Sequence, residues 1–175
     1  EIGSGLVGSE MCIRDSVCAC LEGNRPILVE VQALVAKTPY GMPRRTAVGF
    51  DYNRVTMLLA ILERRLGMDF GAYDAYVNVV GGMRVTEPAA DLAVAAALVS
   101  SYRNRPIPHG VLVMGEVGLT GEVRRIGSPE RRIKDAMNLG FKRFVLPMGK
   151  LSLDEPCNGI VQVKTLEEAL DKVFA

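Results

Sequence analysis

The sequence predicts a single α/β domain in which a mixed β-sheet is flanked by helices. Segments with strand periodicity and segments with helix periodicity alternate along the chain, as in α/β and α+β proteins. The length of 175 residues suits one domain, and 49% of the residues are hydrophobic. Aromatic residues make up only 6% and Trp is absent, so we expect a core of Val, Leu, Ile, Ala and Met.

The first residues differ from the rest of the chain. Residues 1–16 show neither the two-residue period of a strand nor the 3.6-residue period of a helix. The stretch resembles translated adaptor sequence of the kind that contaminates shotgun assemblies. We interpret it as a non-native, disordered segment preceding a domain of residues 17–175. A native but loosely packed arm is the alternative.

The next elements are a strand, a loop and a helix. Residues 27–36 are rich in β-branched side chains with polar residues interleaved, which predicts a half-buried strand. Residues 37–46 contain two prolines and a glycine and predict a loop. Residues 52–66 place their apolar side chains on one helical face, with Asp51 as N-cap and Gly67 as the stop.

The middle of the chain predicts two further strands around an Ala-rich helix. Residues 76–80 form the first of these strands, which ends at a Gly-Gly pair. Residues 89–102 predict a helix whose alanines suit close packing on a sheet, and residues 111–114 predict the second strand. Residues 115–123 have the glycine spacing of a tight turn between strands.

The last third predicts two helices separated by short strands. Ser128 and Pro129 supply an N-cap and a first-turn proline for a helix over residues 129–139, which Gly140 closes. Thr165 and Glu168 form a capping box that opens the last helix. The strands between the two helices are expected at residues 144–146 and 160–163.

Composition excludes several classes of protein. The net charge of +1 gives no global field that would attract nucleic acid, so such binding would need local patches. The longest apolar run, residues 92–99, is far shorter than the ~20 residues of a membrane span, and no secretory signal is evident. We therefore expect a cytoplasmic protein without membrane contact.

Motifs for metal and nucleotide chemistry are missing. The cysteines at 12, 18, 20 and 157 lack the spacing of a zinc site, and we expect reduced thiols. Gly149-Lys150 is followed by Leu151 and lacks the rest of a P-loop, so we expect no ATP hydrolysis by this chain alone. His109 lies between Pro108 and Gly110 and is expected to be a solvent-facing loop residue.

The stretch GGMRVTEPAAD (residues 81–91) has two interpretations. Glycines after a strand, followed by a helix N-terminus, could hold an anion or an oxyanion through backbone amides. The same residues could equally serve only to turn a strand into a helix. The motif by itself leaves both interpretations open.

Three long stretches carry a family resemblance. Residues 22–65 (EGNRPILVEVQALVAKTPYGMPRRTAVGFDYNRVTMLLAILERR), residues 81–101 (GGMRVTEPAADLAVAAALVSS) and residues 115–141 (GEVGLTGEVRRIGSPERRIKDAMNLGF) resemble the C-terminal, Lon-protease-like domain of the RadA family. RadA proteins, also called Sms, are bacterial DNA-repair ATPases. The resemblance runs from about residue 17 to the end. More distantly, the chain is similar to Lon proteolytic domains and to magnesium-chelatase-type AAA proteins, which implies a Lon-type fold of the ribosomal protein S5 domain 2 class.

The resemblance also implies where a Lon-type catalytic dyad would lie. Lon proteases use a serine that follows a Gly-Pro at a helix start, and a neutral lysine that takes its proton. The matching positions here are Ala89 and Glu130, and neither side chain can do that chemistry. Thr86 and Ser100 are the nearest hydroxyls, for which we expect N-cap or helix-surface roles. The resemblance therefore implies a pseudo-protease.

In RadA proteins, such a domain is a ring-forming platform behind an ATPase core. The resemblance implies a hexameric homo-oligomer that contacts single-stranded or branched DNA and acts with RecA on recombination intermediates. It implies no cofactor for this fragment, and ATP, Mg and zinc for a full-length parent with a zinc module and an ATPase core. Arg44 and Arg45 on the predicted loop, and Arg84 near a helix N-terminus, are the DNA-binding candidates. For each arginine, the alternative is a solvated surface position or a salt bridge between subunits. For the chain as a whole, the alternatives are an active Lon-type peptidase and a purely structural assembly domain.

Overall fold

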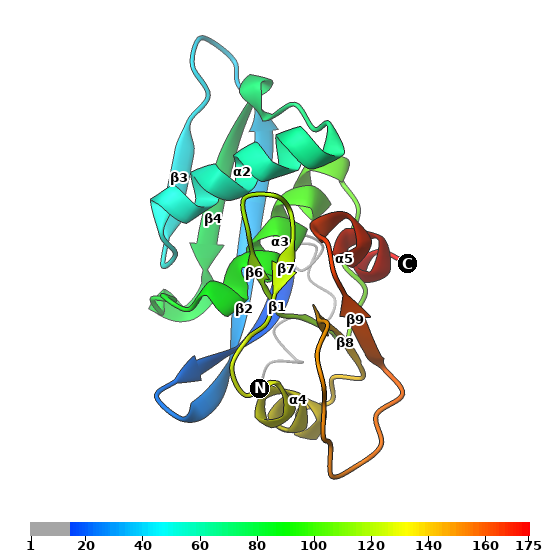
Figure 1. The fold of residues 1–175 in the computed structure, drawn as a ribbon. Helices are drawn as coiled ribbons and strands as arrows, with labels where there is room; N and C mark the ends of the chain where they lie inside the picture. Colours follow the sequence, from blue (N-terminus) through cyan, green and yellow to red (C-terminus); the bar gives the residue numbers. More distant parts are fainter. Residues whose placement is uncertain (1–14) are drawn as a thin grey trace.

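A seven-stranded mixed sheet forms the centre of the molecule (Figure 1). The computed structural model describes residues 15–175, so the interpretation of residues 1–14 lies outside the described residues. Strands β1–β2 and β2–β4 pair antiparallel, and the remaining neighbours pair parallel. In spatial order the strands are β3 (Arg45–Val48), β4 (Tyr73–Val79), β2 (Arg25–Lys37), β1 (Asp15–Glu22), β5 (Val111–Val113), β8 (Arg143–Pro147) and β9 (Ile160–Val163). The predicted mixed α/β class is confirmed.

Within residues 15–175, four α-helices pack around this sheet. Helix α3 contacts β2 and β1, and is itself covered by α2 and α5 (Figure 1). Helix α4 packs against β1 and β2 near the turn that joins them. Strands β6 (Glu116–Val117) and β7 (Val123–Arg124) form a separate hairpin, which agrees with the tight turn predicted from the glycine spacing. The hairpin lies against α3. The helices are α2 (Tyr52–Leu66), α3 (Asp91–Arg103), α4 (Pro129–Asn138) and α5 (Leu166–Val173).

Helix α2 has the predicted limits. The side chain of Asp51 accepts a hydrogen bond from the backbone N–H of Asn53, and Gly67 ends the helix in the left-handed conformation at φ 66°. The apolar face that the periodicity predicted is buried, with Leu66 only partly covered. Local sequence signals are sufficient here because the caps and the apolar stripe agree.

Helix α3 is buried on all sides. A short 3-10 turn (Pro88–Ala90) precedes it, and every residue from Asp91 to Ser101 is buried. Four of these residues are alanines, whose small side chains let the sheet and the neighbouring helices approach the helix backbone closely. The Ala-rich pattern thus marks the centre of the core.

Strands β1 and β3 were not predicted as strands, and β4 begins earlier than predicted. Strand β1 starts at Asp15, inside the segment 1–16 that the sequence assigned to a non-native region, and its Asp15 and Ser16 pair with Gln32 and Val31. Strand β3 starts at Arg45, inside the predicted loop, and β4 starts three residues early at Tyr73. Strand β1 was missed because its centre is buried on both faces, which removes the polar–apolar alternation.

Two predicted helix caps differ in detail. Ser128 precedes α4 in a left-handed conformation, φ 52°, and its side chain makes no capping hydrogen bond. Ser128 thus occupies the N-cap position, as predicted, but without a side-chain cap, and Pro129 begins the helix. At α5, the Thr165 hydroxyl accepts from the N–H of Glu168, but the Glu168 carboxylate accepts from Lys164 N rather than from Thr165 N. Only half of the expected capping box forms.

The buried position of α3 leads to a stability prediction. Ala96 is fully buried in α3, so Ala96→Leu overpacks the core, and we expect it to lower the free energy of unfolding by about 1–3 kcal/mol. The matched change Ala60→Leu lies on the exposed side of α2 and should alter stability by less than about 0.5 kcal/mol. Urea denaturation measures both. Equal effects of the two substitutions would contradict the tight packing of α3.

Candidate functional site

Ala89, at the position where the resemblance to Lon proteases implies the nucleophile, is a buried methyl group. Ala89 lies in the 3-10 turn before α3 and is 2% exposed. Its carbonyl oxygen accepts a hydrogen bond from Gly115 N at 2.9 Å and a weak one from Cys18 Sγ at 3.6 Å. Nothing at this position can attack a carbonyl group.

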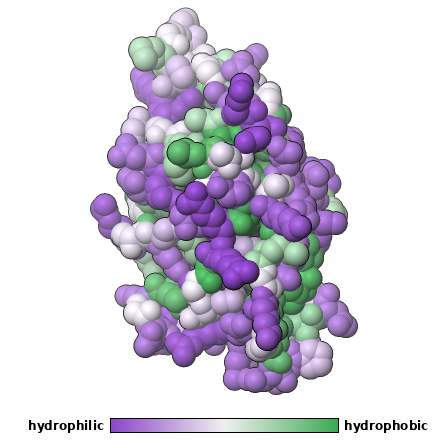
Figure 2. Space-filling model, in the orientation of Figure 1, coloured by the Kyte–Doolittle hydropathy of each residue, from purple (hydrophilic) through white to green (hydrophobic). Residues whose placement is uncertain are grey.

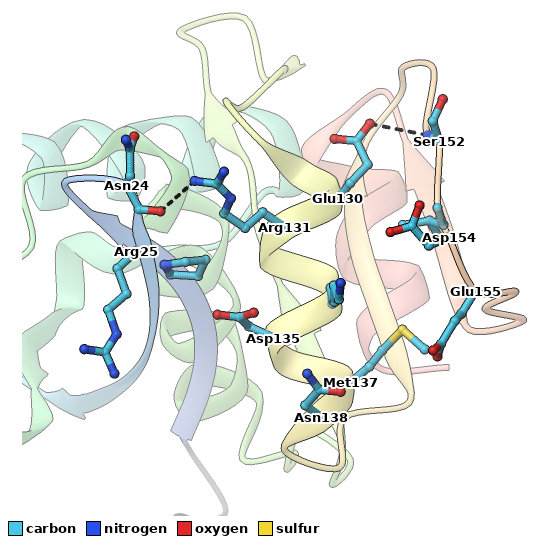
Figure 3. Close-up of a pocket in the computed structure, with 13 residues that line it drawn as sticks. Asn24, Arg25, Glu130, Arg131, Asp135, Met137, Asn138, Ser152, Asp154 and Glu155 are labelled. Atoms are coloured by element: carbon cyan, nitrogen blue, oxygen red, sulfur yellow. Dashed lines mark hydrogen bonds between the residues drawn. The ribbon is translucent and has the colours of Figure 1, made fainter.

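Glu130, at the position of the Lon lysine, turns toward a different neighbour. It lies in the first turn of α4, and its Oε1 accepts from Ser152 N at 3.4 Å. Figure 3 shows this carboxylate directed at the loop that carries Ser152, while Arg131 on the same helix reaches the opposite way to the Asn24 carbonyl. Glu130 lines an open hollow of about 510 Å³ over α4, together with side chains of both charges.

A buried ion pair lies next to Ala89. Arg132, on α4, is 1% exposed and pairs with Glu87, two residues before Ala89. Its other nitrogens donate to the Ala19 carbonyl at 2.9 Å and to the Gly127 carbonyl at 2.8 Å. Glu87 uses its second oxygen to accept from Leu21 N at 2.7 Å. Each guanidinium nitrogen therefore has a partner, and the pair ties α4 to β1 and to the turn before α3.

A second ion pair holds the start of α3. Asp91 is fully buried and accepts from Arg54 Nε at 2.8 Å, with a further contact from Arg54 Nη2. Val117 N donates to the same carboxylate at 3.1 Å. Burial raises the pKa of Asp91, and the hydrogen bonds from Arg54 and Val117 oppose that rise. The pair joins α2, α3 and the β6–β7 hairpin.

The nearest hydroxyls have roles other than those expected. Ser100 is fully buried rather than on a helix surface, and its hydroxyl donates to the Arg105 carbonyl at 2.5 Å. Thr86 is exposed and does not cap the following turn, whose N-cap is Glu87.

The Gly-Gly pair does not form an anion site. Gly81 and Gly82 adopt φ values of 86° and 71° and are exposed. The motif implied that a helix follows the pair at once. In the structure, extended chain separates the pair from the next helical turn, which begins at Pro88. Within that chain, Val85 N donates to the Gly49 carbonyl at 2.7 Å, which ties it to the end of β3. The conformational interpretation of the motif therefore fits the structure better than the oxyanion interpretation.

The three arginines proposed for DNA binding do not form one patch. Arg45 pairs with Ala75 at the first residue of β3, whereas Arg84 lies beside the opposite end of that strand, next to Val85. The Arg45 guanidinium donates to the carbonyls of Tyr73, at 2.5 Å, and Phe70, at 2.8 Å, so it has the structural use that the sequence did not anticipate. The guanidinium of Arg44 is exposed, as is Arg84. Arg44 and Arg84 are thus the candidates whose charges are available, and Arg45 is not.

Other predicted features can be placed as well. His109 is exposed in a turn, as expected. Cys18 and Cys20 are buried free thiols and Cys157 is a half-buried one, while Cys12 lies outside the described residues. Among residues 15–175, no helix combines the length and the hydropathy that a membrane span requires.

Comparison with known proteins decides the family. Residues 31–150 match the family model described as "Subunit ChlI of Mg-chelatase". The chain belongs to this family. Its α/β fold with a mixed sheet is that of the Lon and ribosomal protein S5 class, as the sequence predicted.

Within the ChlI family, the chain is similar to DNA repair proteins named RadA. It is 50% identical over 159 residues to RadA of Pseudomonas aeruginosa, a match that covers 90% of this chain and 35% of the relative. It is 47% identical over 172 residues to RadA of Bacillus subtilis, covering 97% of this chain and 36% of the relative. The chain therefore spans about a third of the length of these relatives, in their C-terminal region. The recognised resemblance to the C-terminal domain of RadA is confirmed.

Sequence reasoning missed both buried ion pairs of this ChlI-type domain. Arg132 follows Arg131 in a charged helix and looks like any solvated cation, and Glu87 gives no local sign of burial. Asp91 did carry a signal, since a single carboxylate at the start of an apolar helix must find a partner if the helix is buried. The identity of that partner, Arg54, depends on the tertiary fold.

The Arg132–Glu87 pair leads to a prediction about stability. Arg132→Ala leaves Glu87 without its cation and the carbonyls of Ala19 and Gly127 without a donor, so we expect a loss of about 3 kcal/mol in the free energy of unfolding. The neighbouring Arg131→Ala removes one exposed hydrogen bond and should cost less than about 1 kcal/mol. Chemical denaturation of both variants makes the comparison. Similar losses would show that the buried pair does not fasten α4.

Proposed function

We propose that this chain is a non-proteolytic assembly and DNA-contact domain of a RadA-type DNA repair protein. The observation that carries the proposal is the occupied dyad region: Ala89 is buried, and the Arg132–Glu87 pair lies beside it. A fold of the Lon class is thus retained while its hydrolytic chemistry is absent. A domain of this kind serves through its surfaces.

The proposed parent is a cytoplasmic DNA-dependent ATPase that processes and branch-migrates recombination intermediates with RecA. In that setting this domain would assemble as a homo-oligomer, a hexamer, and the ATP, Mg and zinc would be bound by other parts of the parent. The similarity to DNA repair proteins named RadA over nine tenths of the chain supports this assignment. The domain's own residues supply assembly surfaces and cations.

Local cations rather than net charge would carry the DNA contact. The net charge is only +1, and the described surface mixes both signs, as the lining of the hollow over α4 illustrates (Figure 3). Arg44 is exposed, and no carboxylate of the described residues lies within ion-pair distance of its guanidinium. An exposed guanidinium of this kind can bind phosphate. We therefore assign Arg44 the leading role and Arg45 and Arg84 secondary ones.

A purely structural assembly domain is the second candidate function. It is favoured by Arg45, whose guanidinium already binds two backbone carbonyls. The two candidates differ in whether the exposed cations touch DNA. An active Lon-type peptidase is the third candidate function. It is disfavoured because Ala89 and Glu130 stand at the positions where the resemblance implies the serine and the lysine.

The absence of a nucleophile predicts no peptidase activity. The purified chain should leave casein and a fluorogenic peptide uncleaved above the buffer background, because Ala89 and Glu130 can neither attack nor accept the proton. Thr86→Ala and Ser100→Ala are the controls for an unexpected hydroxyl. Robust cleavage would contradict the proposal, and cleavage that survives both controls would show an unrecognised nucleophile.

The exposed guanidinium of Arg44 predicts a salt-dependent contact with DNA. Arg44→Ala should weaken single-strand binding and reduce the slope of log K against log salt by about 1, without changing thermal stability. Arg45→Ala should lower the melting temperature as well, because its guanidinium holds two carbonyls. Fluorescence anisotropy across a salt series measures the binding.

Lys150→Ala is the matched charge control. Lys150 is exposed and follows β8, which lies five positions away from β3 in the sheet, next to the edge strand β9. An unchanged salt slope in Arg44→Ala, or an equal change in Lys150→Ala, would favour the purely structural function.

A further inference from the structure

The loop between β2 and β3 projects from the body of the fold and is fixed at its base. In Figure 1 this loop, residues 38–44, extends beyond the rest of the molecule at the top. At its base, Asp74 Oδ1 accepts from Arg44 N at 2.7 Å and from the Thr38 hydroxyl at 3.0 Å. Backbone bonds from Thr38 N to Ala72 O and from Ala75 N to Arg44 O, both 2.9 Å, close the ends of the loop.

The carboxylate at the base is well suited to this role. Chiefly through the hydrogen bond from Arg44 N, the pKa of Asp74 lies below its usual value, so the side chain is ionised at neutral pH. Its charge is directed at the loop ends, where it meets N–H and O–H donors. The loop is therefore held by a strong local anchor and does not depend on packing of its tip.

The tip of the loop carries two almost fully exposed non-polar side chains. Tyr40 is 91% exposed and Met42 is 88% exposed, the two highest values among the large hydrophobic residues of the described chain. Pro39 and Pro43 flank them and restrict the backbone. On the face shown in Figure 2, hydrophilic side chains predominate and non-polar ones form small separate patches. A restrained loop that presents an aromatic ring to solvent is arranged for contact.

The charges around the loop identify the kind of partner. Lys37 and Arg44 are exposed at the two ends of the loop. The acidic groups nearby are already bound to backbone donors: Asp74 to Arg44 N and Asp69 to Gly71 N. An exposed aromatic ring beside exposed cations matches single-stranded nucleic acid, in which bases stack on aromatic rings and phosphates meet cations.

We propose that Tyr40 stacks on an unpaired base of single-stranded DNA while Arg44 contacts a neighbouring phosphate. The inference rests on the proposed DNA-contact function and adds to it the residue that would contact an unpaired base. Base faces in a duplex are covered by their neighbours, whereas an unpaired base leaves its face open to the ring. The loop therefore selects single-stranded over double-stranded DNA.

The absence of Trp from the sequence allows a direct test. Tyr40→Trp places a single indole at the loop tip, and Tyr52→Trp places one at the start of α2, where Tyr52 is 51% exposed. Titration with oligo(dT) should quench the emission of Tyr40→Trp through base stacking and leave that of Tyr52→Trp nearly unchanged. Equal quenching at both positions would overturn the proposal.

Affinity measurements separate stacking from charge. Tyr40→Ala should weaken oligo(dT) binding about tenfold with an unchanged salt slope, because the side chain carries no charge. Tyr40→Phe keeps the ring and should bind like the unmodified chain. Binding to a duplex of the same length should not change in either variant.

The outcomes distinguish this inference from the function on which it rests. If the unmodified chain binds no DNA, the DNA-contact function fails and this inference fails with it. If Arg44→Ala weakens binding while Tyr40→Ala does not, the function stands and only the stacking inference is overturned. A blue shift of Tyr40→Trp emission with rising protein concentration, in the absence of DNA, would instead assign the loop to contact between copies of the chain.

Discussion

The complete burial of helix α3 is the constraint on which the rest of the structure depends. A helix buried on every side needs cover from all directions, and here β1, β2, α2, α5 and the β6–β7 hairpin provide it. Its only carboxylate, Asp91, would be costly without a partner, and Arg54 and Val117 N supply one. The close approach of the surrounding elements follows from the small alanine side chains.

The same constraint fixes the region where a Lon-type enzyme would have its dyad. The turn that leads into α3 carries Ala89, and its position is held by the Arg132–Glu87 pair and by the Gly115 amide. Each guanidinium nitrogen of Arg132 and each carboxylate oxygen of Glu87 makes a hydrogen bond, so the pair helps to fasten α4. The fold has thus retained its architecture at this site, with structural contacts where a protease would place catalytic ones.

The loop that follows β2, residues 38–44, is exposed rather than buried. Its base has ordered hydrogen bonds to Asp74, whereas Tyr40 and Met42 at its tip contribute little to the core because they are almost fully exposed. Restraint at the base lowers the entropy lost when the tip binds a partner.

Sequence patterns were enough to predict the fold class, the limits of α2 and an Ala-rich helix packed closely on the sheet. These features depend on local periodicity, caps and residue identity, which a linear chain carries directly. Only the tertiary structure decided that β1 begins at Asp15, that Arg132 and Arg45 are structural, and that Arg44 and Arg84 lie apart. Strand pairing and buried ion pairs join residues far apart in sequence, such as Ala19 and Arg132, and no local pattern encodes which partner each residue meets.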